Sequence, residues 1–135
     1  MKKPKLSTAK KRAWKAFSEY IRRSYADENG YVSCVTCGVT RQWNDNIDAG
    51  HFLPKSRGSA IYFQVENVHP QCKRCNLMEG GNFEYYYPYM VEMYGESMIE
   101  ELRQLSKTTK KYTVQDLLDI ESEYKEKLNE LSTRS

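Results

Sequence analysis

Long hydrophobic runs are absent from this 135-residue sequence, and no stretch approaches the roughly 20 apolar residues that a membrane-spanning helix needs. The charged start, Met1-Lys2-Lys3, is not followed by the apolar segment of a secretion signal. Internal repeats and low-complexity linkers are also missing, and the length leaves little space for a second core. We therefore expect one domain over residues 1–135, with no membrane contact, in the cytoplasm.

Cysteine is scarce, with only four residues in the chain, but all four fall into Cys-x-x-Cys pairs: Cys34 with Cys37, and Cys72 with Cys75. Two such pairs supply the four thiolates of a tetrahedral structural zinc site. The segment between the pairs is longer than in a usual zinc ribbon, which indicates an insert between the two halves of the site. Disulfides are the alternative, but a reducing cytoplasm disfavours them.

The net charge is only +3, yet positive charge is concentrated at one end of the sequence. Residues 1–23 contain nine basic residues and one acidic residue, whereas the rest of the chain has an acidic excess. A block of this kind favours binding to nucleic-acid phosphates. A solvated helix face with a frayed tail is the other interpretation, and charge alone does not decide between them.

Hydrophobic spacing predicts an α+β fold with helices on both sides of a small central unit. The first helix, residues 7–26, is amphipathic and basic. Short strands are expected near residues 47–53 and 61–64, and a short helix from about residue 72 to Gly80, within a zinc-stapled core over residues 31–82. C-terminal helices are expected over residues 83–131; Asn82 is placed to cap the first of these helices, and Thr113 with Asp116 caps the last.

The last helix has a hydrophobic stripe, which comprises Leu117, Ile120, Tyr124, Leu128 and Leu131. Such a stripe packs either against the same chain or against a partner helix. Both interpretations remain open at this stage.

Three segments carry the functional signal: Asp48-Ala49-Gly50-His51, then Glu66-Asn67, then Cys72-Lys73-Arg74-Cys75-Asn76. A histidine on a strand, an asparagine in the following loop and a polar residue just after Cys-x-x-Cys resemble the HNH, or ββα-metal, endonuclease superfamily. This resemblance implies a ββα-metal core in which two strands and a helix form the active site and zinc staples its edges.

The sequence further resembles the phage lambda NinG (Rap) recombination family. The similarity covers roughly residues 13–105 and includes the run 16–23, both cysteine pairs and Gly81-Asn82. It implies a metal-dependent endonuclease that acts in phage recombination on branched DNA such as Holliday junctions, in the host cell cytoplasm. A sequence-specific nicking or restriction HNH nuclease and a non-catalytic zinc-stapled DNA-binding module are the alternatives.

The resemblance also assigns roles to individual residues. His51 matches the general base, and Asn67 matches the asparagine that holds the loop and orients the base. Asn76 matches a ligand of the catalytic cation, where an oxygen donor favours Mg²⁺ or Mn²⁺. The residue before the base is usually a metal ligand, but here it is Gly50. Asp48 is therefore a candidate ligand, or an ordinary turn carboxylate, and His69 is a second candidate.

Basic residues are candidate phosphate contacts, although surface solvation explains each one about as well. They are Lys10, Lys11, Arg12, Lys15, Arg22 and Arg23 in the first helix, and Lys55, Arg57, Lys73 and Arg74 in the central unit. Resolution of a junction needs two symmetric nicks, so a homodimer is also expected, with the C-terminal stripe as one interface.

Overall fold

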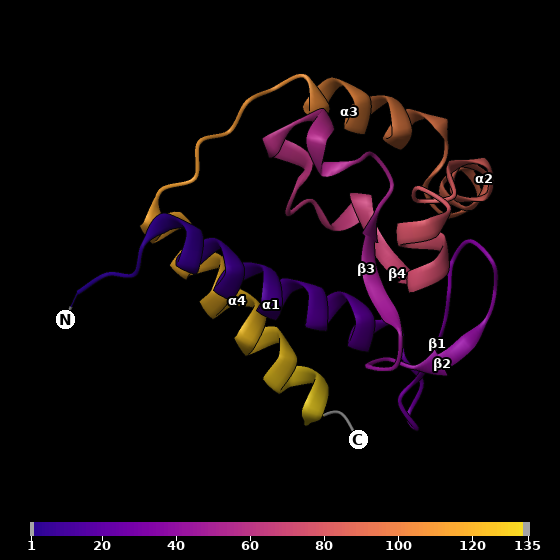
Figure 1. The fold of residues 1–135 in the computed structure, drawn as a ribbon, viewed down its shortest axis with the longest axis horizontal. Coiled ribbons are helices and arrows are strands. Elements are labelled where there is room, and N and C mark those ends of the chain that lie inside the picture. Colours follow the sequence, from indigo (N-terminus) through magenta and orange to yellow (C-terminus); the bar gives the residue numbers. More distant parts are fainter. Residues whose placement is uncertain (1, 134–135) are drawn as a thin grey trace.

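The computed structural model describes residues 2–133, which form a mixed α+β fold (Figure 1). The four α-helices are α1 (Leu6–Ser24), α2 (Phe83–Tyr94), α3 (Glu96–Ser106) and α4 (Val114–Ser132). The strands are β1 (Tyr31–Ser33), β2 (Thr40–Gln42), β3 (Ile47–His51) and β4 (Val68–Cys72). Short helical turns are η1 (Lys55–Arg57), η2 (Ser59–Ile61), η3 (Val65–Asn67) and the π-helix η4 (Arg74–Met78). The predicted α+β class is confirmed at this level.

Two antiparallel hairpins lie at the centre of the fold. β1 pairs with β2, and β3 pairs with β4 so that Ile47 faces Cys72 and His51 faces Val68. η4 follows β4 directly, which gives the order strand, strand, helix. Figure 1 shows this unit between the α1–α4 pair on one side and α2 and α3 on the other. The first hairpin, β1–β2, was not anticipated from the sequence.

The strand expected near residues 61–64 is wrong, because Ile61 ends η2 and is fully buried in the core beside Phe52 and Met90. The partner of β3 is instead β4, whose sequence Val-His-Pro-Gln-Cys is not typical of a strand. Pro70 is tolerated because its carbonyl points away from β3 and accepts a bond of 3.0 Å from the Val35 amide. The missing amide hydrogen of Pro70 therefore removes no bond from the ladder with β3.

α1 and α4 lie side by side, and small residues of α1 allow the close approach (Figure 1). Leu117 packs on Ala9 and Ala13, all three with at most 1% exposure, and Tyr124 meets Phe17 edge to face at 4.8 Å. The predicted C-terminal stripe thus packs on its own chain. α1 buries Leu117 and Tyr124, whereas Ile120, Leu128 and Leu131 stay partly exposed, so the expected dimer interface on this stripe remains a prediction.

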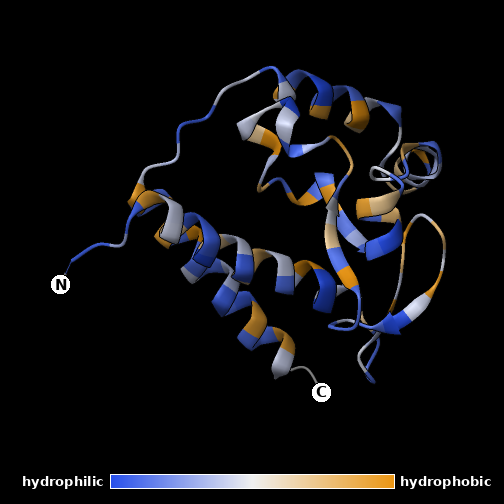
Figure 2. Ribbon diagram, viewed as in Figure 1, coloured by the Kyte–Doolittle hydropathy of each residue, from blue (hydrophilic) through white to orange (hydrophobic). Residues whose placement is uncertain are grey.

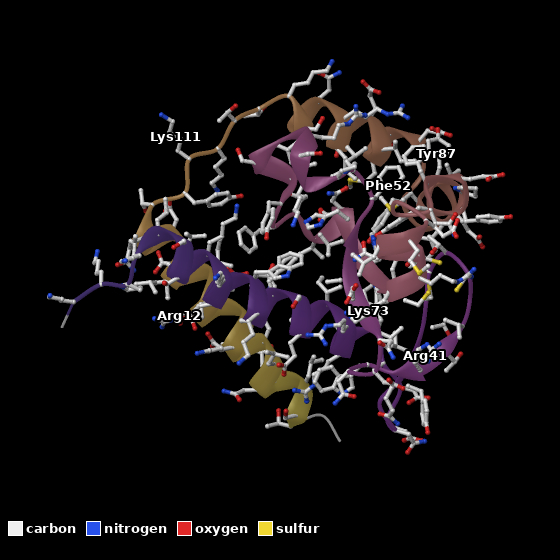
Figure 3. All side chains as sticks on the ribbon, viewed as in Figure 1. Arg12, Arg41, Phe52, Lys73, Tyr87 and Lys111 are labelled. Carbon is white, nitrogen blue, oxygen red and sulfur yellow. The ribbon has the colours of Figure 1, made fainter. Side chains whose placement is uncertain are left out.

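Arg12 joins the same pair of helices. Its guanidinium makes an ion pair of 2.9 Å with Glu121, which is only 7% exposed and also pairs with Lys125 at 3.0 Å. Burial raises the pKa of Glu121, but these two cations outweigh it and lower the pKa overall. Figure 3 shows Arg12 on the side of α1 that faces α4. Arg12 thus has a partner within the chain, and its predicted contact with DNA phosphates stays a prediction.

Of the two predicted helix caps, the one before α4 is present and the one before α2 is absent. α4 begins with a capping box: the Asp116 amide donates to Thr113 Oγ1 at 3.0 Å, and the Thr113 amide donates to Asp116 Oδ2 at 2.9 Å, as predicted. Asn82 precedes α2 in a left-handed conformation with φ of 52°, but its side chain points to Cys75 Sγ and makes no cap. The connector between α3 and α4 is mostly hydrophilic (Figure 2).

Within residues 2–133, no helix is both long enough and apolar enough to cross a membrane.

The α1–α4 contact should make a measurable contribution to stability. Leu117→Ala removes a fully buried side chain and should lower the free energy of unfolding by about 2–4 kcal/mol. Leu6→Ala is the matched control, because Leu6 is 53% exposed and should cost little. Denaturant unfolding of both variants measures the difference. Equal stability of the two variants would contradict the packing described here.

Candidate functional site

A cleft of about 600 Å³ runs along β3, which pairs on one edge only, with β4. α1 forms one wall and η4 the other. The lining side chains come from five separate segments and include Trp14, Ser18, Arg22, Asn46, Asp48, His51, Lys55, Tyr62, Lys73, Asn76 and Leu77. The fold thus brings together three residues predicted for catalysis or metal binding: His51, Asp48 and Asn76.

His51 is held in one orientation at the end of β3. Its ring stacks on Trp14, with centroids 5.2 Å apart and an interplanar angle of 14°, and lies 5.3 Å from the ring of Tyr62. Nε2 is 3.0 Å from the carbonyl oxygen of Tyr62. Because a carbonyl only accepts, Nε2 must donate, and Nδ1 keeps its lone pair in the neutral ring.

The surroundings of His51 keep the ring neutral. Burial is the main cause that lowers its pKa below 6.5, and the positive charge of Lys55 acts in the same direction. The hydrogen bond to the Tyr62 carbonyl opposes them without reversing the shift. A neutral imidazole with a free Nδ1 is the form that a general base requires.

Asp48 and Asn76 meet in the same cleft. The Asn76 carboxamide Nδ2 is 3.0 Å from Asp48 Oδ2, and Lys73 Nζ is 2.6 Å from Asp48 Oδ1. A half-turn of the carboxamide would place its oxygen beside the carboxylate. Two protein oxygens, from one carboxylate and one amide, form the partial donor set that Mg²⁺ or Mn²⁺ accepts when phosphate and water supply the rest. Asp48 and Asn76 therefore fit a hard divalent metal ion. In this structure the Asp48 carboxylate pairs with the ammonium group of Lys73.

Steric contact explains why position 50 is a glycine. A side chain there would collide with the carboxamide oxygen of Gln71, which is fully buried. The other end of that carboxamide is fixed, because Nε2 donates to the Gly81 carbonyl at 2.8 Å and lies 3.2 Å from Thr36 Oγ1. Gln71 therefore fills the place where a ligand at position 50 would project.

Asn67 and His69 both lie outside the cleft. Asn67 is fully buried and pairs with both backbone groups of Leu53, at 2.8 Å to the amide and 3.0 Å to the carbonyl, so it holds the loop after β3. His69, a candidate ligand in the sequence, is buried between the hydroxyls of Tyr86 at 2.9 Å and Tyr94 at 2.7 Å. Burial lowers the pKa of His69 to about 3. The ligand role of His69 is corrected, since its two ring nitrogens are both engaged by tyrosines.

The four cysteines come together as predicted. All four Sγ atoms lie within 4.8 Å of one another, the Cys37 and Cys72 sulfurs are 3.7 Å apart, and all four thiols are free. A tetrahedron of Zn–S bonds of about 2.3 Å has sulfurs about 3.8 Å apart, so the spacing fits a metal and not a disulfide. Burial raises the pKa of Cys34, but hydrogen bonds from Thr36 and nearby groups outweigh it and lower the pKa to about 6.

The predicted basic residues divide by position. Arg22, Lys55 and Lys73 line the cleft, and Lys10 lies 4.4 Å over the ring of Tyr62 at its edge. Arg23 pairs with Glu19 at 3.0 Å, away from the cleft. The remaining ones, apart from Arg12, are exposed outside it: Lys11, Lys15, Arg57 and Arg74. Figure 3 shows Lys73 beside β3.

Sequence reasoning missed two functional contacts. Trp14 and Tyr62 enclose the His51 ring, yet 37 and 11 positions separate them from it. Trp14 is one of the apolar residues at helical spacing in the first helix, and its spacing of four from Lys10 and Ser18 is the available signal that it also shares a face with polar residues.

Comparison with known proteins identifies the family. The model of the family "Bacteriophage Lambda NinG protein" matches residues 1–134. The chain is 28% identical to protein ninG of Escherichia phage lambda and 29% identical to protein ninG of Salmonella phage P22, each over 90% of this chain and 56% of the relative. It thus spans little more than half the length of these relatives. No solved structure matches the chain significantly. A family match over nearly the whole chain shows that it belongs to the bacteriophage lambda NinG family.

Proposed function

We propose that this protein is a metal-dependent DNA endonuclease of the HNH type with His51 as its general base. One observation supports this above the others: a single cleft contains both a neutral histidine with an available Nδ1 and a carboxylate paired with an amide. Phosphodiester hydrolysis needs a base for water and a cation for the leaving oxygen. Branched DNA in phage recombination, inside the host cytoplasm, is the substrate that we propose.

In the proposed reaction, Nδ1 of His51 takes a proton from water as the water oxygen attacks phosphorus. The P–O3′ bond breaks and the departing 3′ oxygen takes a proton from a second water molecule, which leaves a 3′ hydroxyl on one strand end and a 5′ phosphate on the other. Asp48 and Asn76 would hold the divalent cation, which when bound stabilises the charge on the departing 3′ oxygen. Trp14 and the Tyr62 carbonyl keep the imidazole aimed during this transfer.

The cations of the cleft suit a phosphate backbone. Arg22 and Lys55 line the two sides, and Lys73 can exchange its pairing with Asp48 for a substrate phosphate when a metal binds the carboxylate. Lys10, Lys11 and Lys15 on α1 extend this positive surface beyond the cleft. A homodimer also remains a proposal, with the partly exposed residues Ile120, Leu128 and Leu131 of α4 as a candidate interface.

We also propose that Cys34, Cys37, Cys72 and Cys75 hold one structural zinc. The ion would join the β1–β2 hairpin to the end of β4, and so fix the start of η4, where Lys73 and Asn76 lie. Burial together with neighbouring cysteines raises the pKa of Cys72 to about 12, whereas the pKa of Cys34 is lowered.

Elemental analysis should find one zinc per chain in the purified, reduced protein. Cys37→Ser should lose the metal and lower the unfolding temperature, because a site that joins two distant segments contributes its binding energy to folding. Ser33→Ala, on the same hairpin and exposed, is the control that should keep both. A folded, reduced, metal-free wild-type protein would refute the zinc site.

His51→Ala should lower the cleavage rate at least about 100-fold, since it removes the proton acceptor. Folding, zinc content and DNA binding should stay near wild type. Asn76→Ala should also lose activity but recover part of it at high Mn²⁺, because Asp48 still supplies a ligand. Single-turnover cleavage of labelled DNA measures both. Wild-type rates in the His51 variant would show that the base is another group.

The pH dependence of cleavage provides a separate test of the His51 environment. Because burial lowers its pKa, the imidazole stays neutral at pH 7, and the acidic fall in rate should be centred below pH 6.5. Trp14→Ala opens the ring to water and should move this midpoint upward, whereas Trp14→Phe should keep it low. Trp43→Phe is the control, because Trp43 does not line the cleft. An unchanged midpoint in Trp14→Ala would contradict the proposed shielding.

A further inference from the structure

Two neighbouring apolar side chains of η4 are exposed beside the cleft. Leu77 is 67% exposed and Met78 is 81% exposed. Leu77 lines the cleft in company with Lys73 and Asn76, which lie four and one residues before it. An isolated exposed leucine is ordinary, but this pair directly follows Asn76, the proposed ligand of the catalytic cation.

The backbone that carries the pair is fixed on its inner side. Cys75 is fully buried in the cysteine cluster, and its carbonyl accepts a bond of 2.9 Å from the Gly81 amide. Gly80 and Gly81 then turn the chain with φ of 58° and 91°, a conformation that glycine adopts without strain. Leu77 and Met78 therefore project from an anchored element.

The charge around the pair identifies the class of partner. Arg22, Lys55 and Lys73 line the same cleft as Leu77, and Asp48 is paired with Lys73, so the apolar side chain lies in a cleft with a net positive charge. If the phosphates of a DNA strand bind these cations, the neighbouring base step of that strand would lie against Leu77. Apolar side chains such as Leu and Met insert between base steps that are already unstacked or easily unstacked, and the cost of unstacking is smallest where pairing is interrupted.

We propose that Leu77, with Met78 beside it, is a wedge that contacts unstacked bases at a branch or distortion in DNA and so selects branched DNA over regular duplex. This inference rests on the proposed function and adds the element that recognises substrate structure. The wedge acts on bases, whereas Arg22, Lys55 and Lys73 act on phosphates and do not distinguish branched from linear DNA.

The test compares binding of a four-way junction and a linear duplex of the same sequence, in buffer without Mg²⁺ or Mn²⁺, with 2-aminopurine at the branch point. The variants are Leu77→Ala, Met78→Ala and the double variant. Leu77→Phe restores an apolar tip. Met93→Ala is the matched control, because Met93 is 49% exposed on α2 and does not line the cleft.

Leu77→Ala should bind the junction about tenfold more weakly, equal to about 1.4 kcal/mol, and lose the rise in 2-aminopurine fluorescence that wild type and Met93→Ala show. Duplex affinity and thermal stability should not change, and Leu77→Phe should restore the signal. Wild-type selectivity in the double variant, or equal losses on both DNAs, would overturn this inference alone. A wild-type protein that binds no DNA would overturn the proposed function as well.

Discussion

The meeting of two distant Cys-x-x-Cys segments is the constraint on which the rest of the structure depends. The cluster ties the β1–β2 hairpin to the end of β4, and Gln71 and Lys73 flank the third cysteine. Gln71 then occupies the space over Gly50, while the helical turn after Cys72 presents Asn76 to Asp48. A metal held by the cysteines would therefore act on the cleft by fixing the positions of these residues.

The cleft contains a neutral histidine and a carboxylate in different surroundings. His51 is enclosed by aromatic rings and kept neutral, whereas Asp48 contacts Lys73 and Asn76. α1 takes part in both the fold and this site, because one of its faces packs on α4 and the next places Trp14 against His51. Because α1 has these two faces, its basic residues have different neighbours. Arg12 pairs with Glu121 of α4, and Arg22 faces the cleft.

Local patterns were enough to predict the helices, the cysteine cluster and the placement of His51, since each depends on spacing within a few residues. The β4 strand could not be predicted in this way, because Pro70 and polar residues mask it and its pairing is set by contacts with β3 and Val35. The partners of His69 and the ion pair of Arg12 were also missed, as both join residues far apart in the sequence. The sequence does not show which acidic residue a basic residue pairs with, so charge alone could not separate Arg12, which pairs with Glu121, from the cations that line the cleft.

The central claim is that the cleft cuts DNA with the aid of a divalent cation. The most direct measurement incubates the zinc-loaded protein with an end-labelled four-way junction and a matched duplex, with and without added Mg²⁺ or Mn²⁺, and maps the product ends. The account predicts cleavage of the junction only when the cation is added, with 3′ hydroxyl and 5′ phosphate ends. A folded, zinc-loaded protein that binds the junction and leaves every strand intact in both metals would contradict it, and would identify the protein as a DNA-binding module.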